Sequence, residues 1–171
     1  NEHKRSDYLD SIVNEATEFY APYSEILKLV GIGNHESKIL DLYGTNLIDR
    51  FADRMRLMHK SECCAGGYGG WVLLKFNIRK TISIQKRIKY FHGAGGGGPV
   101  TRGVIQSNRQ AVYLPDADVV LNGHTHDSWH VPIARERINA HGTIYKDLQH
   151  HVRSSTYKDE YRDGSSGWHV E

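Results

Sequence analysis

The sequence predicts an α/β fold, and three observations favour this class. Short apolar runs typical of buried strands recur along the chain, and segments with apolar residues at helical spacing lie between them. Several of the apolar runs also end beside glycine, histidine or asparagine, and α/β folds place their chemistry at strand ends. With 171 residues, 39% of them hydrophobic, we expect residues 1–171 to form a single domain with a buried core.

The first third of the chain predicts two helical regions around one strand. Residues 7–20 carry an apolar face at helical spacing, with Ser6 or Asp7 as the cap and Pro22 as the stop. Residues 26–32 form a short apolar run that predicts a strand, and residues 37–58 predict a helix broken near 44–46. The second part of that helix carries an apolar stripe that we expect in the core, namely Leu47, Ile48, Phe51, Met55 and Met58.

The remainder predicts mostly strands. Residues 63–70 are expected to form a loop, and the segment beyond His150 turns polar, which predicts loops or edge strands. A short helix is expected at 101–113. Strands are predicted at residues 71–78, 80–85, 87–91, 119–121, 128–133 and 135–138, with a further hairpin arm starting at 142.

Composition narrows the class of protein. The net charge of +2 is too small to indicate nucleic-acid binding by itself, and no apolar run approaches the ~20 residues that span a bilayer. The two cysteines, Cys63 and Cys64, are adjacent, so we expect inert thiols, no disulfide framework and a cytoplasmic protein. The chain begins without a methionine or a signal peptide, so we expect it to belong to a longer protein.

Polar side chains suited to a metal follow three of the predicted strands. The run Val119–Asp127 passes from a strand through Gly123, which permits a sharp turn and a close backbone approach, to His124 and His126. Asn34 follows the strand at 26–32, and His92 follows the strand at 87–91. One amide oxygen and neutral imidazoles suit zinc, manganese, iron or nickel.

Each of these residues also has an ordinary structural interpretation. Asn34 is a suitable helix cap, and the glycine run after His92 suits a loop. The other histidines are expected at the surface, namely His130, His141, His150, His151 and His169.

Three motifs resemble the calcineurin-like metallophosphoesterase superfamily in order and in placement after strands. They are Gly33-Asn34-His35-Glu36, His92-Gly93 and Gly123-His124-Thr125-His126. The resemblance spans residues 26–130 and implies an α/β/β/α sandwich that hydrolyses phosphoesters with two divalent metal ions (Mn, Zn, Fe or Ni). It implies metal-ligand roles for Asn34, His92, His124 and His126. It makes His35 the catalytic residue beside the substrate, and Glu36 a support for its loop.

The chain departs from the family pattern upstream of Asn34. The family's Asp-x-His and Gly-Asp-x-x-Asp motifs are absent, and Asp7 and Asp10 are the only aspartates there. We therefore expect an N-terminally truncated domain whose isolated chain binds metal weakly and is inactive or nearly so. Monoesters, cyclic nucleotides, dinucleotide polyphosphates and nucleic-acid diesters all fit the resemblance, with a nucleotide or nucleic-acid phosphodiester favoured and no membrane partner.

A second hypothesis is a catalytically inactive fragment or a nucleic-acid-binding module that uses basic residues and no metal. Its candidate contacts are Arg50, Arg54, Arg56, Lys60, Lys75, Arg79, Lys80, Lys86, Arg87 and Lys89. The chain also holds 20 acidic residues, and metal content separates the two hypotheses.

Overall fold

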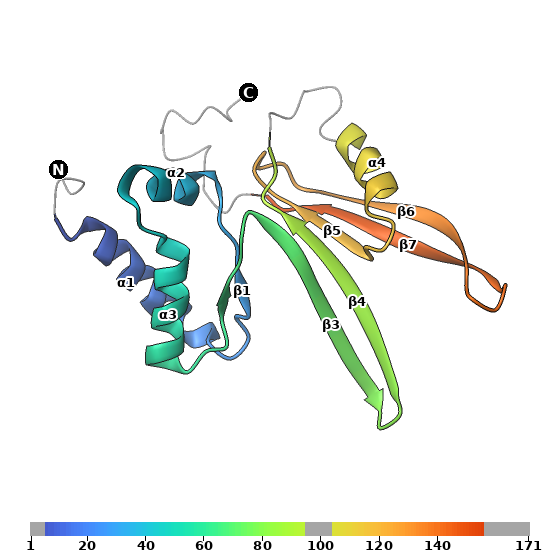
Figure 1. Ribbon diagram of the computed structural model, residues 1–171, viewed down its shortest axis with the longest axis horizontal. Helices are drawn as coiled ribbons and strands as arrows, with labels where there is room; N and C mark the ends of the chain where they lie inside the picture. Colours follow the sequence, from blue (N-terminus) through green and yellow to red (C-terminus); the bar gives the residue numbers. More distant parts are fainter. Residues whose placement is uncertain (1–5, 95–103, 156–171) are drawn as a thin grey trace. The chain divides into compact units, whose positions relative to one another are not determined.

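The computed structural model describes residues 6–94 and 104–155, which belong to two compact units, Asn1–Gly69 and Gly70–Glu171 (Figure 1). Three α-helices dominate the first unit, and the second is built on a five-stranded sheet with one helix. The predicted α/β class is therefore confirmed. Within the described ranges, none of the helices combines the length and apolar character needed to cross a bilayer.

The first unit packs α1 (Tyr8–Tyr20) against α3 (Leu47–His59). α1 matches its predicted range, although the Asp7 side chain makes no capping hydrogen bond, and a short 3-10 turn, η2 (Ala21–Tyr23), holds Pro22. Leu47, Phe51 and Met55 of the apolar stripe of α3 lie in the core as predicted, whereas Ile48 is half-buried and Met58 is exposed. The buried cluster consists of Val13, Leu47, Phe51, Ala52, Met55 and Cys63.

The predicted helix break at 44–46 is confirmed. α2 (Asn34–Tyr43) ends where Gly44 adopts a left-handed conformation with φ of 65° and donates its N–H to the Leu40 carbonyl. Asn46 then caps α3, because its side-chain oxygen accepts from the backbone N–H groups of Ile48 and Asp49. α2 starts earlier than predicted, at Asn34 rather than Ser37.

The strands of the first unit are shorter than the sequence predicted. β1 (Leu29–Val30) covers only part of the apolar run at 26–32, because Ile26 and Leu27 donate their N–H groups to the Tyr23 carbonyl and form a turn. β2 (Cys64–Ala65) pairs with β1 in parallel, inside the segment predicted to be a loop.

The second unit contains a mixed sheet with the strand order β3-β4-β5-β7-β6. β4 pairs with β5 in parallel, β5 pairs with β7 in parallel, and β6 runs antiparallel to β7. The carboxyl ends of β4, β5 and β7 therefore meet at one edge of the sheet. The strands are β3 (Gly69–Arg79), β4 (Ile82–Phe91), β5 (Val119–Asn122), β6 (Trp129–Ile138) and β7 (Ile144–Arg153).

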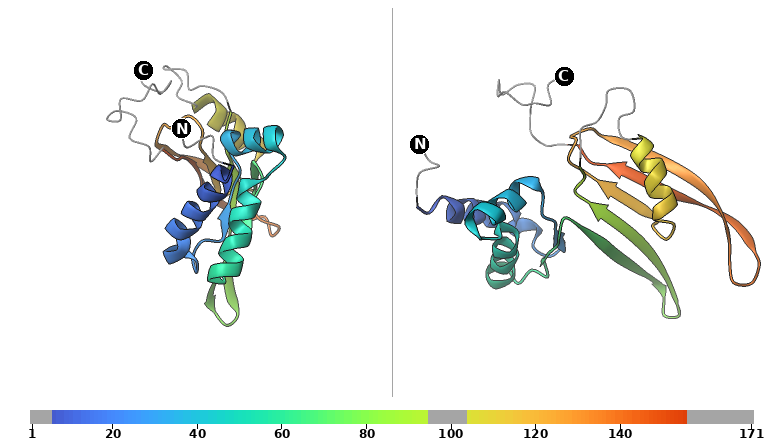
Figure 2. Two further views of the ribbon diagram at one scale, coloured as in Figure 1. Left: turned by 90° about the vertical axis from the view of Figure 1, so that its left-hand side faces the viewer. Right: turned by 45° about the horizontal axis from the view of Figure 1, so that its top comes forward.

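Helix α4 (Val104–Tyr113) covers part of one face of this sheet (Figure 2). The side-chain amides of Gln110 and Asn122 exchange two hydrogen bonds, of 3.0 and 3.3 Å. The Gln149 amide nitrogen donates to the Leu114 and Ala117 carbonyls just after the helix. The predicted helix is confirmed over 104–113, and its first residues, 101–103, lie outside the described ranges.

The C-terminal strand corrects two predictions. Beyond His150 the chain was expected to form loops or edge strands, yet β7 extends to Arg153 and lies between β5 and β6. His151 was expected at the surface but is fully buried, as is Gln149, which accepts a hydrogen bond from the His151 ring. Most of these buried polar atoms hydrogen-bond to one another or to backbone carbonyls, and among the described residues Nδ1 of His151 has no partner.

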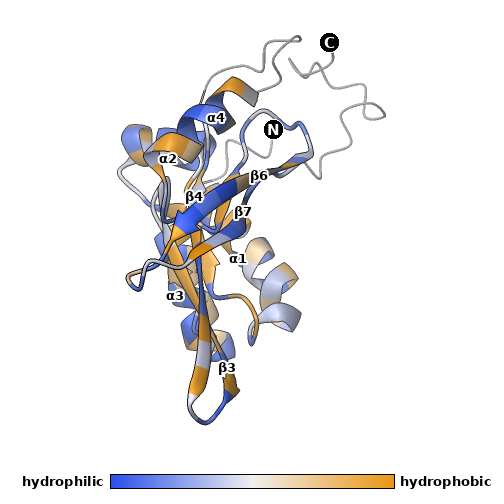
Figure 3. Cartoon of the chain, turned by 90° about the vertical axis from the view of Figure 1, so that its right-hand side faces the viewer, coloured by the Kyte–Doolittle hydropathy of each residue, from blue (hydrophilic) through white to orange (hydrophobic). Residues whose placement is uncertain are grey.

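Apolar and polar residues are interspersed along the β3–β4 hairpin (Figure 3), and many of the apolar side chains are exposed. They include Trp71, Leu73, Phe76, Ile78, Ile82 and Ile84.

Candidate metal centre

The site is built where β4 and β5 end side by side. Phe91 and Asn122, the last residues of the two strands, are partners in the parallel register. The backbone continues the ladder by one bond beyond them, because the Gly123 N–H donates to the His92 carbonyl at 3.0 Å. The sequence motifs that contain His92 and His124 are therefore neighbours in space, as the strand-end argument predicted.

The two imidazoles face each other directly. Nδ1 of His124 lies 3.2 Å from Nε2 of His92, and the ring planes cross at 69°. Without an ion, this separation is a hydrogen bond in which one ring nitrogen carries the proton. A tetrahedral ion with ligand nitrogens at about 2.05 Å holds them about 3.3 Å apart, and an octahedral ion at about 2.1 Å holds adjacent ones about 3.0 Å apart. The observed separation fits two ligands of one ion.

Glycines beside the histidines permit this approach. Gly93 has a φ of +108°, and a Cβ atom there would lie 2.8 Å from the Gly123 carbonyl oxygen and 3.0 Å from the His124 Cβ. A Cβ on Gly123 would lie 3.3 Å from the His92 carbonyl oxygen. The close backbone approach predicted for Gly123 is thus confirmed. A side chain at either position would push the two histidine-bearing segments apart.

The turn that follows β5 holds an unusual backbone. His124 and His126 have φ values of 75° and 59°, in the left-handed region that non-glycine residues rarely occupy. The intervening Thr125 donates its N–H to the Gly123 carbonyl. The Ser155 hydroxyl donates to the His126 carbonyl at 3.1 Å. Strain of this kind clusters at functional sites, because it persists only where surrounding contacts enforce it.

Asn34 and His35 open α2 in the first unit. The residue in the capping position is Gly33 rather than Asn34, and the Glu36 carboxylate accepts the Gly33 N–H at 3.1 Å. The predicted supporting role of Glu36 agrees with this bond. Because Asn34 and His35 belong to a different unit from the histidine pair, the convergence of all the predicted ligands stays a prediction.

Residues 6–94 and 104–155 contain no group of three or more His, Cys, Asp or Glu side chains arranged for a metal. The structure instead brings together a pair, His92 and His124, with His126 two residues along the same turn.

Sequence reasoning missed two residues that bear on this site, Thr125 and Arg153. The Thr125 hydroxyl accepts a 2.7 Å hydrogen bond from the guanidinium of Arg153, the last residue of β7. Burial lowers the pKa of Arg153, and the carboxylate of Asp127 opposes that shift. The period-two alternation of Gln149, His151 and Arg153 was the available signal that these residues share one sheet face.

A second pair of histidines lies on β6 and β7, where Nε2 of His130 is 2.9 Å from Nδ1 of His150. His130 is exposed as expected, and His150 is half-buried. The two ring planes are only 24° apart, and the short separation is that of a direct hydrogen bond.

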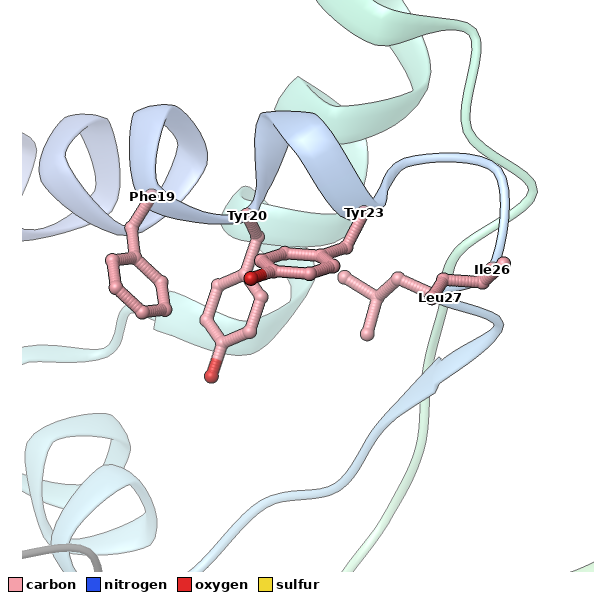
Figure 4. Close-up of a pocket in the computed structure, with 5 residues that line it drawn as sticks. All are labelled: Phe19, Tyr20, Tyr23, Ile26 and Leu27. Atoms are coloured by element: carbon pink, nitrogen blue, oxygen red, sulfur yellow. The ribbon is translucent and has the colours of Figure 1, made fainter.

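The predicted ligands include neither cysteine of the first unit, and none of them lines the hollow at the end of α1. Cys63 and Cys64 are free thiols, and burial raises the pKa of Cys63, in keeping with an inert thiol. A shallow apolar hollow at the end of α1 is lined by Phe19, Tyr20, Tyr23, Ile26 and Leu27 (Figure 4). It presents aromatic rings, aliphatic side chains and tyrosine hydroxyls, which are weak ligands for a divalent ion.

No protein-family description, curated protein or solved structure matches this chain.

Proposed function

We propose that this chain contributes to metal-dependent hydrolysis of phosphoester bonds, with a nucleotide or nucleic-acid phosphodiester as the favoured substrate class. The observation that carries the proposal is the 3.2 Å separation of the His92 and His124 ring nitrogens at adjacent ends of parallel strands. Left-handed backbone at His124 and His126 supports it, because strain is retained where a side chain must be aimed. The proposal includes the finer fold, the α/β/β/α sandwich of the resembled superfamily.

The donor set fits a borderline divalent ion such as manganese, zinc, iron or nickel. In this proposal Asn34, His92 and His124 hold one ion and His126 holds the other. When bound, the ions supply Lewis acidity at the phosphoryl group. His35 donates a proton to the leaving oxygen or stabilises the charged phosphoryl group. The imidazoles bind an ion only in their neutral form.

The acidic ligands of the family pattern are not present upstream of Asn34. In this proposal the 171 residues supply the ligands of one ion and only part of those of the other. We propose that the chain by itself binds a single ion weakly, and that its hydrolytic rate is low because the carboxylates that bind the other ion are missing.

The test is titration calorimetry with Ni²⁺ or Mn²⁺ on the 171-residue chain. We expect one ion per chain, with binding reduced at least tenfold in His92→Ala and His124→Ala. The control is His141→Ala, which removes an exposed imidazole from the β6–β7 turn. Equal binding by all three variants and the unmodified chain would refute the site. Hydrolysis of a nitrophenyl phosphodiester with Mn²⁺ gives the activity, which His35→Ala should abolish.

The metal-free nucleic-acid module is disfavoured by the surroundings of its candidate contacts. Within residues 6–94 and 104–155, half of the ten basic residues lie in ion pairs with aspartates, which offset their charge. Arg50 and Arg54 pair with Asp10, Arg56 with Asp53, Lys86 with Asp118 and Arg87 with Asp116. A chain that binds single-stranded or duplex DNA tightly but takes up no metal would favour the module instead.

A further inference from the structure

Arg153 is an arginine buried at the edge of the sheet that carries the histidines. It is only 4% exposed, and it is the register partner of Asn122 on one side and Trp129 on the other. A buried guanidinium is costly unless its surroundings replace the water that it loses. The burial of the Arg153 guanidinium therefore needs an explanation other than packing.

The hydrogen-bond partners of Arg153 are uncharged, and the Asp127 carboxylate is the acidic group that acts on its charge. One terminal nitrogen donates to the Thr125 hydroxyl at 2.7 Å, and the other donates to the Gln106 side-chain oxygen at 3.2 Å. The guanidinium carbon lies 5.2 Å from the centre of the Trp129 ring, a cation–π contact. Among the described residues, the Nε atom of Arg153 has no hydrogen-bond partner. The hydroxyl, the amide and the ring therefore contact the guanidinium directly, and the Asp127 carboxylate adds a favourable charge.

The contact with Thr125 acts on the histidine turn. Thr125 lies between the two residues with left-handed backbone, His124 and His126. A charge-assisted hydrogen bond to a β-branched side chain fixes both its position and its rotamer. The turn is also tied by the Ser155 hydroxyl at the His126 carbonyl. The arginine therefore holds the middle of a strained turn whose flanking residues are the predicted ligands.

We propose that Arg153 is a positioning residue, which through the Thr125 hydroxyl keeps His124 and His126 in the conformation that binds a metal ion. The inference rests on the proposed metal-binding role of these histidines. Partners that orient ligands typically change metal affinity 10- to 100-fold when they are removed. We expect a loss of metal affinity of the same size when the Arg153–Thr125 hydrogen bond is removed. In this role Arg153 acts through Thr125 and not through a contact with either imidazole.

The principal variants are Thr125→Val, which removes the hydroxyl at nearly constant shape, and Thr125→Ser, which retains it. Titration of each with Ni²⁺ alone gives the affinity. We expect about 10- to 100-fold weaker binding for Thr125→Val and binding close to that of the unmodified chain for Thr125→Ser. The matched control is Thr143→Val, at an exposed threonine in the β6–β7 turn, which should bind as the unmodified chain does. Equal affinities for Thr125→Val and Thr125→Ser overturn the inference.

Loss of folding is separated from loss of positioning by the double variant Thr125→Val with Arg153→Met. Removing the Thr125 hydroxyl and the Arg153 guanidinium together leaves neither group buried without its hydrogen-bond partner. The unfolding midpoint should therefore recover toward that of the unmodified chain. The affinity for Ni²⁺ should remain low. Recovery of both the midpoint and the affinity would mean that the pair is merely structural and would overturn the inference.

A readout without metal keeps the inference distinct from the proposed function. If the unmodified chain takes up no Ni²⁺, the metal site fails, and the Cα and Cβ chemical shifts of His124 and His126 decide the positioning role. Thr125→Val should move these shifts toward those of an extended backbone, and Thr143→Val should not. Unchanged shifts in Thr125→Val overturn the inference.

Discussion

Replacing Gly93 with alanine should damage both the stability of the second unit and its metal site. Residue 93 has a φ of +108°, which costs an L-residue about 1–3 kcal/mol. The added Cβ would lie 2.8 Å from the Gly123 carbonyl oxygen, where ordinary contact begins at 3.4 Å. Relief of that contact requires a shift of about 0.6 Å between the two strand ends, and overpacking of this kind costs about 1–3 kcal/mol more.

The shift has a direct consequence for the histidines. Opening a 3.2 Å separation between the His92 and His124 nitrogens by that amount takes it beyond what one ion or one hydrogen bond spans. We therefore expect Gly93→Ala to lower the free energy of unfolding by about 2–6 kcal/mol and to abolish measurable Ni²⁺ binding.

Urea denaturation and titration calorimetry check these two results, and Gly142→Ala is the matched control. Gly142 has a φ of +78°, but a Cβ atom there would have nothing within 4 Å. It should therefore cost only the backbone strain, about 1–2 kcal/mol, and leave Ni²⁺ binding unchanged. The reasoning is refuted if Gly93→Ala is no less stable than Gly142→Ala, or if it binds Ni²⁺ as tightly as the unmodified chain.

Three further predictions concern titratable groups. Burial lowers the pKa of His151, so its imidazole stays neutral in the folded chain, whereas in the unfolded chain it takes up a proton below pH about 6.5. The free energy of unfolding should then fall with decreasing pH by up to about 1.4 kcal/mol per pH unit, and urea unfolding of His151→Leu should show a shallower dependence; parallel slopes would contradict this. The two hydrogen bonds from Arg135 lower the pKa of Asp147, so their stabilisation is present at neutral pH and is lost in acid as Asp147 becomes protonated. Asp147→Asn should cost about 1 kcal/mol at pH 7, measured by thermal unfolding, and no change in midpoint would count against the pair. Cys64 is exposed and Cys63 is buried with a raised pKa, so a thiol reagent should modify one cysteine in the folded chain and two in urea; a Cys64→Ser variant that still reacts when folded would disprove the assignment.

The parts of the fold that follow from local chemistry could be predicted from the sequence. Gly44 ends one helix and Asn46 begins the next because left-handed backbone and side-chain capping depend on a few neighbouring residues. The meeting of His92 and His124 could also be predicted, since two parallel strands must end at the same sheet edge. In both cases the pattern and its physical cause lie within a short segment or a simple topological rule.

The parts of the fold that depend on residues far away in the sequence could not be predicted. Gln149, His151 and Arg153 resemble a polar loop in hydropathy. Gln149 and Arg153 nevertheless hydrogen-bond to other segments, and His151 hydrogen-bonds to Gln149 within the strand, so that they form a buried strand. β2 escaped prediction because two residues carry no periodicity, and its pairing with β1 alone defines it. Whether Asn34 and His35 join the histidine turn depends on the arrangement of two units, which no local pattern encodes.

In the left-handed turn after β5, the residues that are proposed to bind a metal ion are also the residues whose backbone is strained. Glycine adopts left-handed backbone without steric strain, so His126→Gly should relieve about 1 kcal/mol of backbone strain while removing the imidazole. Substitutions that remove a functional group usually lower the stability of a fold or leave it unchanged. A gain in stability for His126→Gly would therefore indicate that this histidine serves function rather than folding. Screening this chain for thermostability alone would therefore tend to select away the residues that give the turn its chemistry.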